Sequence, residues 1–362
     1  MNRSVYSVFR TFVLVGMLIS PLFVKGETDV ESPVHGPSID KLHLETRLAW
    51  EGENIDGTGI HDNMGFKGQF FNLRFDGQIV DGLTFSYRQR LNKQTRQTFW
   101  DATDWIHLDW QINGKWGLSA GKQVVALGGY EYDRAPIDLY YCSEFWYNIA
   151  CYQFGLSGSF QPTVNDKVIA QICNSPFRQW AGNNTYGLNF LWYGKHAWWE
   201  SMWSASILEH QRGQWMTMFC LGNRFNISRN VLLDVDYTNR SYWHHTSFFK
   251  DFTLTGEFSV MAHESTRVYA KYTYDQNKSG SAADMLVTDG TSVHRIGAGF
   301  EVSPVRKYRD GLRVFGAAMY GFGDNTNAGG VVADKQLMVQ AGVKFRLDVW
   351  DAINRVVNNK KK

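Results

Sequence analysis

The chain has 362 residues, with 37 basic and 35 acidic side chains that give a formal net charge of +2, and 44% of its residues are hydrophobic. This balance excludes a strongly basic nucleic-acid-binding protein and a disordered acidic chain. No shift in composition marks a linker, so one large domain is the simpler interpretation. The four cysteines Cys142, Cys151, Cys173 and Cys220 form no CxxC pair and accompany no paired histidines, so we expect neither a metal nor a cofactor.

The first 26 residues have the pattern of a secretory signal peptide. Arg3 and Arg10 precede an apolar run, Thr11 to Val24, that ends in small residues. A membrane anchor is the alternative, but the run is about 14 residues long and contains Pro21, whereas a spanning helix needs roughly 20 residues. We therefore expect residues 1–26 to be removed on export. No later stretch is apolar enough for a transmembrane helix, which excludes a helical membrane protein.

Apolar and polar residues alternate with a period of two along most of the mature chain, and this pattern predicts β-strands. In the first of them, Leu42, Leu44 and Leu48 share one face, while Glu45 and Arg47 lie on the other. The sixteen predicted apolar faces fall at 42–50, 71–79, 83–87, 106–112, 116–120, 152–156, 168–172, 188–192, 203–207, 219–225, 231–237, 252–260, 268–274, 296–302, 312–320 and 337–347.

Short and long connections alternate between these strands, as in an outer-membrane barrel with tight periplasmic turns and longer external loops. Tight candidates include Asp81-Gly82 and Asn113-Gly114, and long ones include 52–65 and 275–291. A soluble β-sandwich would also alternate, but here the apolar faces end in Trp or Tyr, as expected at a lipid interface. In lipid an open sheet would leave the backbone groups of its edge strands unpaired, so the sheet is expected to close.

The predicted fold is therefore all-β, a transmembrane up-and-down antiparallel β-barrel of about sixteen strands. The barrel is expected to occupy residues 27–350, and a basic tail at 351–362 is expected in the periplasm. A barrel of this size is too wide for its own side chains to fill, so its lumen should hold water.

One long aromatic segment, Val124 to Asn148, separates the fifth and sixth strands. We interpret it as a loop that folds inward and constricts the pore, with an external loop packed over the rim as the alternative. Cys142 and Cys151 flank its end and could form a disulfide in the oxidising periplasm. The candidate constriction residues are Glu131, Asp133, Arg134, Asp138 and Glu144.

Inward-facing charges predict two unlike walls. The basic wall, from the last strand through the third, carries Lys41, Arg47, Arg74, Arg88, Arg90, Lys344 and Arg346. The opposite acidic wall carries Asp234, Asp236, Asp251 and Glu257. A transverse field of this kind favours polar solutes and supports at most a mild anion preference. Mutual pairing that merely keeps a polar lumen satisfied is the alternative.

Several segments resemble the phosphate-selective porin O and P family as it occurs in Bacteroidetes-type bacteria. They are GQFFNLRFDGQI with LTFSYRQRLN, the WIHLDWQINGKWGLSAGKQ hairpin before the long loop, and the closing VQAGVKFRLDVW. The resemblance implies a homotrimeric anion porin in the outer membrane of a Gram-negative cell. It also implies that Arg74, Arg88 and Arg90 take the part of the family's arginine ladder.

The function expected from these features is passive diffusion of small hydrophilic or anionic solutes through a pore in contact with outer-membrane lipid. The alternative is a plugged barrel with a structural, adhesive or secretion-accessory role. An enzyme is disfavoured, because His244 and His245 lie in a loop without a GxSxG or HExxH motif.

Overall fold

The computed structural model describes residues 37–57, 59, 64–93, 98–177, 184–242, 249–280, 284–305, 311–327 and 332–352. The expected signal peptide, His244 and His245, and the tail beyond Ala352 lie outside the described residues. The strands span Ser38 to Asp348, within the range that the sequence assigns to the barrel.

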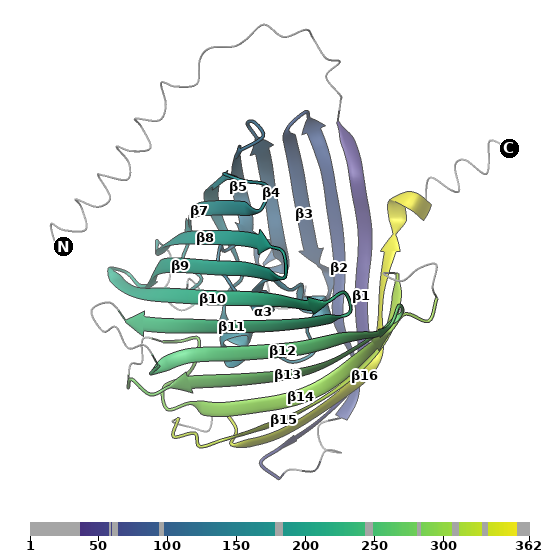
Figure 1. Cartoon of the computed structure of the whole chain (residues 1–362), viewed down its shortest axis with the longest axis vertical. Helices are drawn as coiled ribbons and strands as arrows, with labels where there is room; N and C mark the ends of the chain where they lie inside the picture. Colours follow the sequence, from purple (N-terminus) through teal and green to yellow (C-terminus); the bar gives the residue numbers. More distant parts are fainter. Residues whose placement is uncertain are drawn as a thin grey trace, which may run out of the picture. The chain divides into compact units, whose positions relative to one another are not determined.

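The described residues form sixteen strands in one closed antiparallel sheet, in which β1 pairs with both β2 and β16 (Figure 1). The prediction of sixteen strands is confirmed, and closure leaves no unpaired sheet edge in lipid. The strands are β1 Ser38–Ile55, β2 Met64–Val80, β3 Leu83–Arg90, β4 Thr103–Gln111, β5 Trp116–Val124, β6 Tyr152–Phe160, β7 Asp166–Asn174, β8 Tyr186–His196, β9 Trp199–Gln211, β10 Gln214–Ser228, β11 Val231–Tyr242, β12 Asp251–His263, β13 Thr266–Asn277, β14 Ser292–Val302, β15 Leu312–Gly323 and β16 Lys335–Asp348.

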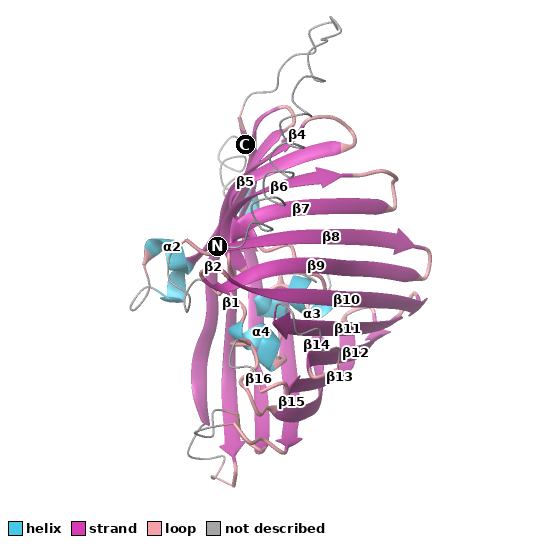
Figure 2. Cartoon of the chain, turned by 90° about the vertical axis from the view of Figure 1, so that its left-hand side faces the viewer, coloured by secondary structure: helices cyan, strands magenta, loops and turns pink. Residues whose placement is uncertain are grey.

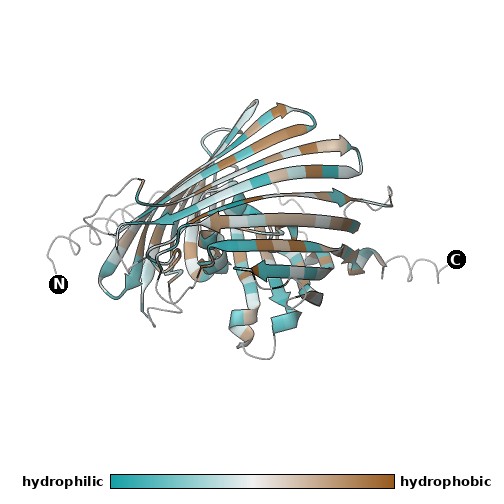
Figure 3. Ribbon diagram, turned by 90° about the horizontal axis from the view of Figure 1, so that it is seen from below, coloured by the Kyte–Doolittle hydropathy of each residue, from teal (hydrophilic) through white to brown (hydrophobic). Residues whose placement is uncertain are grey.

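Side chains of opposite character alternate along the strands, which gives the barrel two distinct faces (Figure 3). On the outside, Leu156, Phe190 and Ile296 are 60%, 51% and 55% exposed. Their sequence neighbours Asn189 and Arg295 point inward and are buried. An apolar exterior around a polar interior is the pattern of a barrel that lies in lipid.

Aromatic side chains gather near both ends of the strands. Near the β8–β9 turn, the rings of Trp198 and Phe225 lie 5.7 Å apart, and Trp199 Nε1 donates a hydrogen bond of 3.0 Å to Asn223 Oδ1. Towards the opposite end, Tyr237 and Phe252 have their centroids 5.5 Å apart. Indole and phenol rings suit the membrane–water interface, because each combines an apolar body with a polar tip.

Short turns lie at one end of the barrel and longer connections at the other, except for the nine-residue β14–β15 connection (303–311) and the short β9–β10 turn. The turn Asp81-Gly82 is two residues long, as predicted, and the turns Arg229-Asn230 and Glu264-Ser265 are equally short. The β9–β10 connection, Arg212-Gly213, is equally short, although it lies at the end where the alternation predicts a long loop. Gly213 adopts a φ of +74°, which a tight hairpin turn requires and glycine tolerates.

The helical segments are short, and apart from a turn of helix at 349–352 after β16 the described ones belong to two connections (Figure 2). η3 (Leu91–Lys93) and α2 (Phe99–Ala102) lie between β3 and β4. α3 (Tyr130–Asp133), η4 (Pro136–Asp138) and α4 (Glu144–Asn148) lie between β5 and β6. Within the part of the chain that the structure describes, no helix has the length and apolar character needed to cross a membrane.

Candidate functional site

The connection between β5 and β6 lies inside the barrel, and we call it the inward loop (residues 125–151). Its backbone reaches strands far from its origin: Gly128 N donates to Ser204 Oγ on β9 at 2.8 Å, and Glu144 N donates to Asp275 on β13 at 2.9 Å. From the other side, the Gln340 side chain on β16 donates to Tyr140 O. The aromatic segment Val124 to Asn148 therefore crosses the lumen and does not cover the rim.

Glycine lets the start of the inward loop approach the wall closely. A Cβ on Gly222 of β10 would lie 2.8 Å from the Cα of Gly129, and a Cβ on Gly128 would lie 2.3 Å from Met202 O. Such distances are shorter than atoms tolerate, so these positions require glycine. The close approach brings the amides of Tyr130 and Glu131 to the Asp236 carboxylate at 2.9 and 2.8 Å.

Three of the four residues of the acidic wall bind the inward loop. Arg134 donates to Glu257 at 2.6 Å and to Asp234 at 3.1 Å, while Asp236 accepts the two loop amides. Asp251 is separate from this group, because it accepts the amides of residues 278 and 279. The acidic wall is therefore largely a docking surface, since its carboxylates are occupied by the loop and by neighbouring arginines.

Two residues of the basic wall also hold the loop. Arg47, which is buried, donates through Nη1 to Ile137 O at 3.0 Å and to Leu139 O. Lys344 Nζ lies 2.6 Å from Asp138 and 2.7 Å from Glu301. These contacts place η4 against β1 and β16, the two strands that close the barrel.

The remaining loop candidates differ in their surroundings. Glu131 is buried and lies 2.6 Å from Lys271 Nζ on β13. Glu144 pairs with Arg295 on β14, while Asp133 is exposed at the end of α3. Together the loop's charged groups bond mainly to β11–β16, so the loop is held on one side of the lumen.

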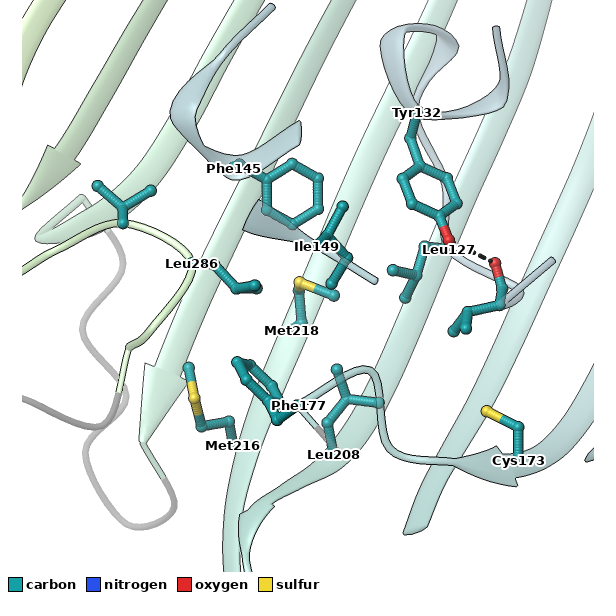
Figure 4. Packing of buried hydrophobic residues seen from close by; sticks show 12 residues of the cluster. Leu127, Tyr132, Phe145, Ile149, Cys173, Phe177, Leu208, Met216, Met218 and Leu286 are labelled. Atoms are coloured by element: carbon teal, nitrogen blue, oxygen red, sulfur yellow. Dashed lines mark hydrogen bonds between the residues drawn. The ribbon is translucent and has the colours of Figure 1, made fainter. Parts of the chain in front are cut away.

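An apolar cluster inside the lumen strengthens this docking. Figure 4 shows Phe145 and Ile149 of the loop beside Met218 of β10 and Leu286 of the β13–β14 connection. Asn148 Nδ2 also donates to Leu286 O at 2.9 Å. The full cluster comprises Val125, Leu127, Tyr132, Phe145, Ile149, Cys173, Phe177, Leu208, Met216, Met218, Leu286 and Val287. Removing this apolar surface from water favours the docked loop.

The opposite wall, β2–β4, carries the rest of the predicted basic residues. Arg74 lies 2.7 Å from Asp76, and Arg90 lies 2.7 Å from Asp104. Arg88 lies 3.5 Å from the same Asp104 carboxylate. Asp104 is the extra residue of a bulge in the β3–β4 ladder, where Arg88 faces Trp105 and the next pair joins positions 89 and 103.

The last two basic residues lie on the closing strands β1 and β16. Arg346 lies 2.8 Å from Glu45, and Lys41 is exposed at the start of β1. Six of the seven residues of the basic wall thus have an acidic or carbonyl partner. The seventh, Lys41, lines a cavity.

Two adjoining cavities lie on the side of the lumen away from the docked loop. One, of about 440 Å³, borders β1–β5, and the other, of about 510 Å³, borders β3–β7. Both are lined by Thr84, His107 and Asp109, so they meet. The hydroxyl, imidazole and carboxylate groups of these residues give the two cavities a polar surface.

Charge around η4 keeps Asp138 ionised. Burial alone would raise the pKa of the Asp138 carboxyl, but Lys344 and Arg313 lower it below the usual value. Arg313 Nη2 donates to Asp138 at 3.1 Å, and Asp138 is only partly exposed. The loop is therefore attached here through a carboxylate that carries its charge at neutral pH.

The proposed Cys142–Cys151 disulfide is absent, because all four cysteines are free thiols. Helix α4 separates the two residues. Cys142 is buried with its amide on Tyr147 Oη, and Cys151 Sγ faces Ile149 O at 3.6 Å. Burial raises the pKa of the Cys142 thiol well above its usual value, which disfavours the reactive thiolate.

Several docking residues were not singled out from the sequence. Lys271, Asp275, Arg295, Glu301 and Arg313 all contact the loop or the residues that hold it. Each lies at an inward position of β13, β14 or β15, so the same alternation that predicted the strands would have identified them.

The sequence matches the model of a known protein family. The model of the family described as "Phosphate-selective porin O and P" matches residues 42–230, just over half of the chain. The chain belongs to this family. It is thus an outer-membrane porin, in agreement with its closed sixteen-stranded barrel. No curated protein matches the sequence significantly.

Solved structures similar to this porin share its fold at low sequence identity. The anion-selective porin from Comamonas acidovorans has a TM-score of 0.61 at 12% identity, covering 86% of this chain and 100% of its own. OmpT of Vibrio cholerae has a TM-score of 0.59 at 11% identity, with 88% and 99% covered. The channel DcaP of Acinetobacter baumannii has a TM-score of 0.60 at 10% identity, with 89% and 100% covered.

Proposed function

We propose that this porin conducts small hydrophilic solutes passively along the wall formed by β1–β7, with a mild preference for anions. The observation that carries the proposal is the one-sided docking of the inward loop. Its hydrogen bonds reach β1, β7, β9, β11, β13 and β16, whereas the two adjoining cavities lie mainly along β2–β6. A loop held to one side narrows the lumen without filling it.

Charge distribution supports the anion preference. The loop occupies Asp234, Asp236 and Glu257, so these carboxylates contribute little field to the open side. On the open side, Arg74 and Arg346 remain about one-third exposed. The anion-selective porin from Comamonas acidovorans shares this fold, which agrees with this direction. The preference is mild, because both arginines are paired with carboxylates.

A plugged barrel with a structural, adhesive or secretion-accessory role is the second candidate. The apolar cluster favours it, because that cluster fills part of the lumen between the loop and β7–β10. Conduction distinguishes the two candidates. We propose no catalytic role, since the family and the fold are those of a channel.

We further propose that the protein is exported by a signal peptide at residues 1–26, leaves a basic tail at 351–362 in the periplasm, and forms a homotrimer in outer-membrane lipid. OmpT of Vibrio cholerae, with a TM-score of 0.58 and 12% identity, was solved in a trimer form, which supports the oligomeric state. Native mass spectrometry of detergent-extracted protein tests it, and a monomer as the sole species would refute it.

Conductance in planar bilayers tests the pore. Folded protein should give stepwise ion currents, and their absence would favour the plugged barrel. In a salt gradient, the reversal potential should indicate preference for chloride over potassium. Replacing Arg74, Arg88 and Arg90 by Ala should lower the anion-to-cation permeability ratio, whereas the control Arg212→Ala, in the β9–β10 turn, should leave it unchanged. An unaltered ratio in the triple variant would refute these arginines as the source of selectivity.

A further inference from the structure

The 440 Å³ cavity on the open side of the lumen carries charges of both signs beside an indole ring. Its basic residues are Lys41 and Arg74, its acidic residues are Asp40, Asp76 and Asp109, and its aromatic residues are Phe85 and Trp105. Two basic groups face three carboxylates, so the cavity has no excess of positive charge to hold a simple anion. Its size is within the range of sites that take small organic molecules.

Hydrogen bonds fix one end of this cavity. Trp105 Nε1 donates to Ser86 Oγ at 2.8 Å, Ser86 Oγ donates to Asp76 Oδ1 at 2.5 Å, and Arg74 Nε donates to the other oxygen of Asp76 at 2.7 Å. The guanidinium of Arg74 lies 5.6 Å from the centre of the Trp105 ring. This connected set holds an indole and a guanidinium in one arrangement before any solute arrives.

The hydrogen-bond donors of Arg74 are not all used. Within the described residues its bond to Asp76 engages Nε, and its side chain is 33% exposed. The two terminal nitrogens can therefore donate to a carboxylate in the cavity, the geometry in which guanidinium groups bind best. Trp105 offers an adjacent surface on which an apolar or aromatic group can pack.

The other end of the cavity presents a carboxylate. Asp109 lies on the same strand as Trp105, with a carboxylate oxygen 3.0 Å from His107 Nδ1 and with Ser119 and Lys167 nearby. Its side chain is 44% exposed. Four residues of extended strand separate Trp105 and Asp109 by about 13 Å, which is the span of an extended peptide of roughly two to four residues.

We infer that this cavity is a binding site for short zwitterionic peptides with an apolar or aromatic C-terminal side chain. The peptide carboxylate binds Arg74, its last side chain packs on Trp105, and its ammonium group binds Asp109. The inference rests on the proposed pore, because the peptide reaches the cavity through the open side of the lumen. Neither a simple anion nor an uncharged sugar uses both charged ends.

Peptide-induced block of single-channel current tests the site. The probe is the tripeptide glycyl-glycyl-phenylalanine, compared with its N-acetyl form, its C-terminal amide and triglycine, which lack the ammonium group, the carboxylate and the aromatic group respectively. We expect the unmodified tripeptide to block the current, and each modification to lower its association constant about tenfold. Trp105→Ala and Asp109→Asn should weaken the block to a similar extent.

Matched controls are available in the same chain. Trp198→Ala removes a 64% exposed indole from the β8–β9 turn, and Asp81→Asn removes an exposed carboxylate from the β2–β3 turn, so neither should change the block. Equal block by the acetylated peptide, stronger block by maltose, or an unchanged constant for Trp105→Ala would overturn the inference. Calorimetric titration of detergent-solubilised porin measures the same constants without ion flow. Absence of current with intact peptide binding would therefore refute the pore and leave the binding site standing.

Discussion

Replacing Arg47 by Ala should loosen the inward loop without unfolding the barrel. Arg47 is the buried side chain on β1 whose Nη1 donates to the carbonyl oxygens of Ile137 and Leu139, and its guanidinium lies 4.5 Å from the Phe70 ring and 5.2 Å from the Tyr140 ring. The substitution leaves the carbonyl oxygens of Ile137 and Leu139 without their charged donor, which should lower the free energy of loop docking by about 2–3 kcal/mol. The undocked population of the loop should then rise roughly 30- to 150-fold.

Single-channel recording measures this change directly. The variant should show more current noise in the open state and brief steps to higher conductance, because segment 136–139 leaves the wall transiently. Arg74→Ala is the matched control, since it removes an arginine from the side of the lumen that the loop does not occupy, and it should alter selectivity with no added noise. Arg47→Ala currents as quiet as those of the unmodified porin would refute the idea that these carbonyl contacts hold the loop.

Three further predictions concern the same loop. Arg134→Ala leaves Asp234 and Glu257 without their loop partner, so the anion-to-cation permeability ratio should fall at least twofold; a reversal potential that does not move would contradict it. Lys344 and Arg313 depress the pKa of Asp138, so its contribution to docking should persist from pH 8 to 5 and be lost only as the pH falls below the usual value of 3.8. Current noise against pH checks this, with Asp138→Asn expected to be noisy already at pH 7. Alkylation of the unfolded, non-reduced protein should add four adducts in intact mass spectrometry, one for each free cysteine, whereas two adducts would demonstrate a disulfide.

Strand positions could be predicted because lipid outside and water inside impose the same alternation on every strand. Each of the sixteen predicted apolar faces lies within one strand or one residue past its end, including those of the short β3 and β5. Turn chemistry helped in the same way, since Asp81-Gly82 marks a real two-residue turn. The β9–β10 hairpin could not be anticipated from alternating loop lengths, because a single glycine at a positive φ shortened it.

The side of the lumen to which the loop binds was not predicted, although the sequence contains a clue. Met216 and Met218 of β10, and Phe315 and Met319 of β15, are apolar residues at inward positions that should face water. Strands that are apolar on both faces indicate a wall covered from within. The bulge at Asp104 is different, because it depends on tertiary pairing that a period-two pattern does not record.

The inward loop also affects the β1–β16 pairing that closes the barrel. Arg47 and Lys344 are directly opposite each other in the β1–β16 ladder, and two like charges at such a position repel. Asp138 and the carbonyl oxygens of η4 lie against this pair and offset the repulsion. The inward loop therefore narrows the pore and also stabilises the pairing of β1 with β16. The two closing strands are fully stabilised only when the loop is docked in the lumen.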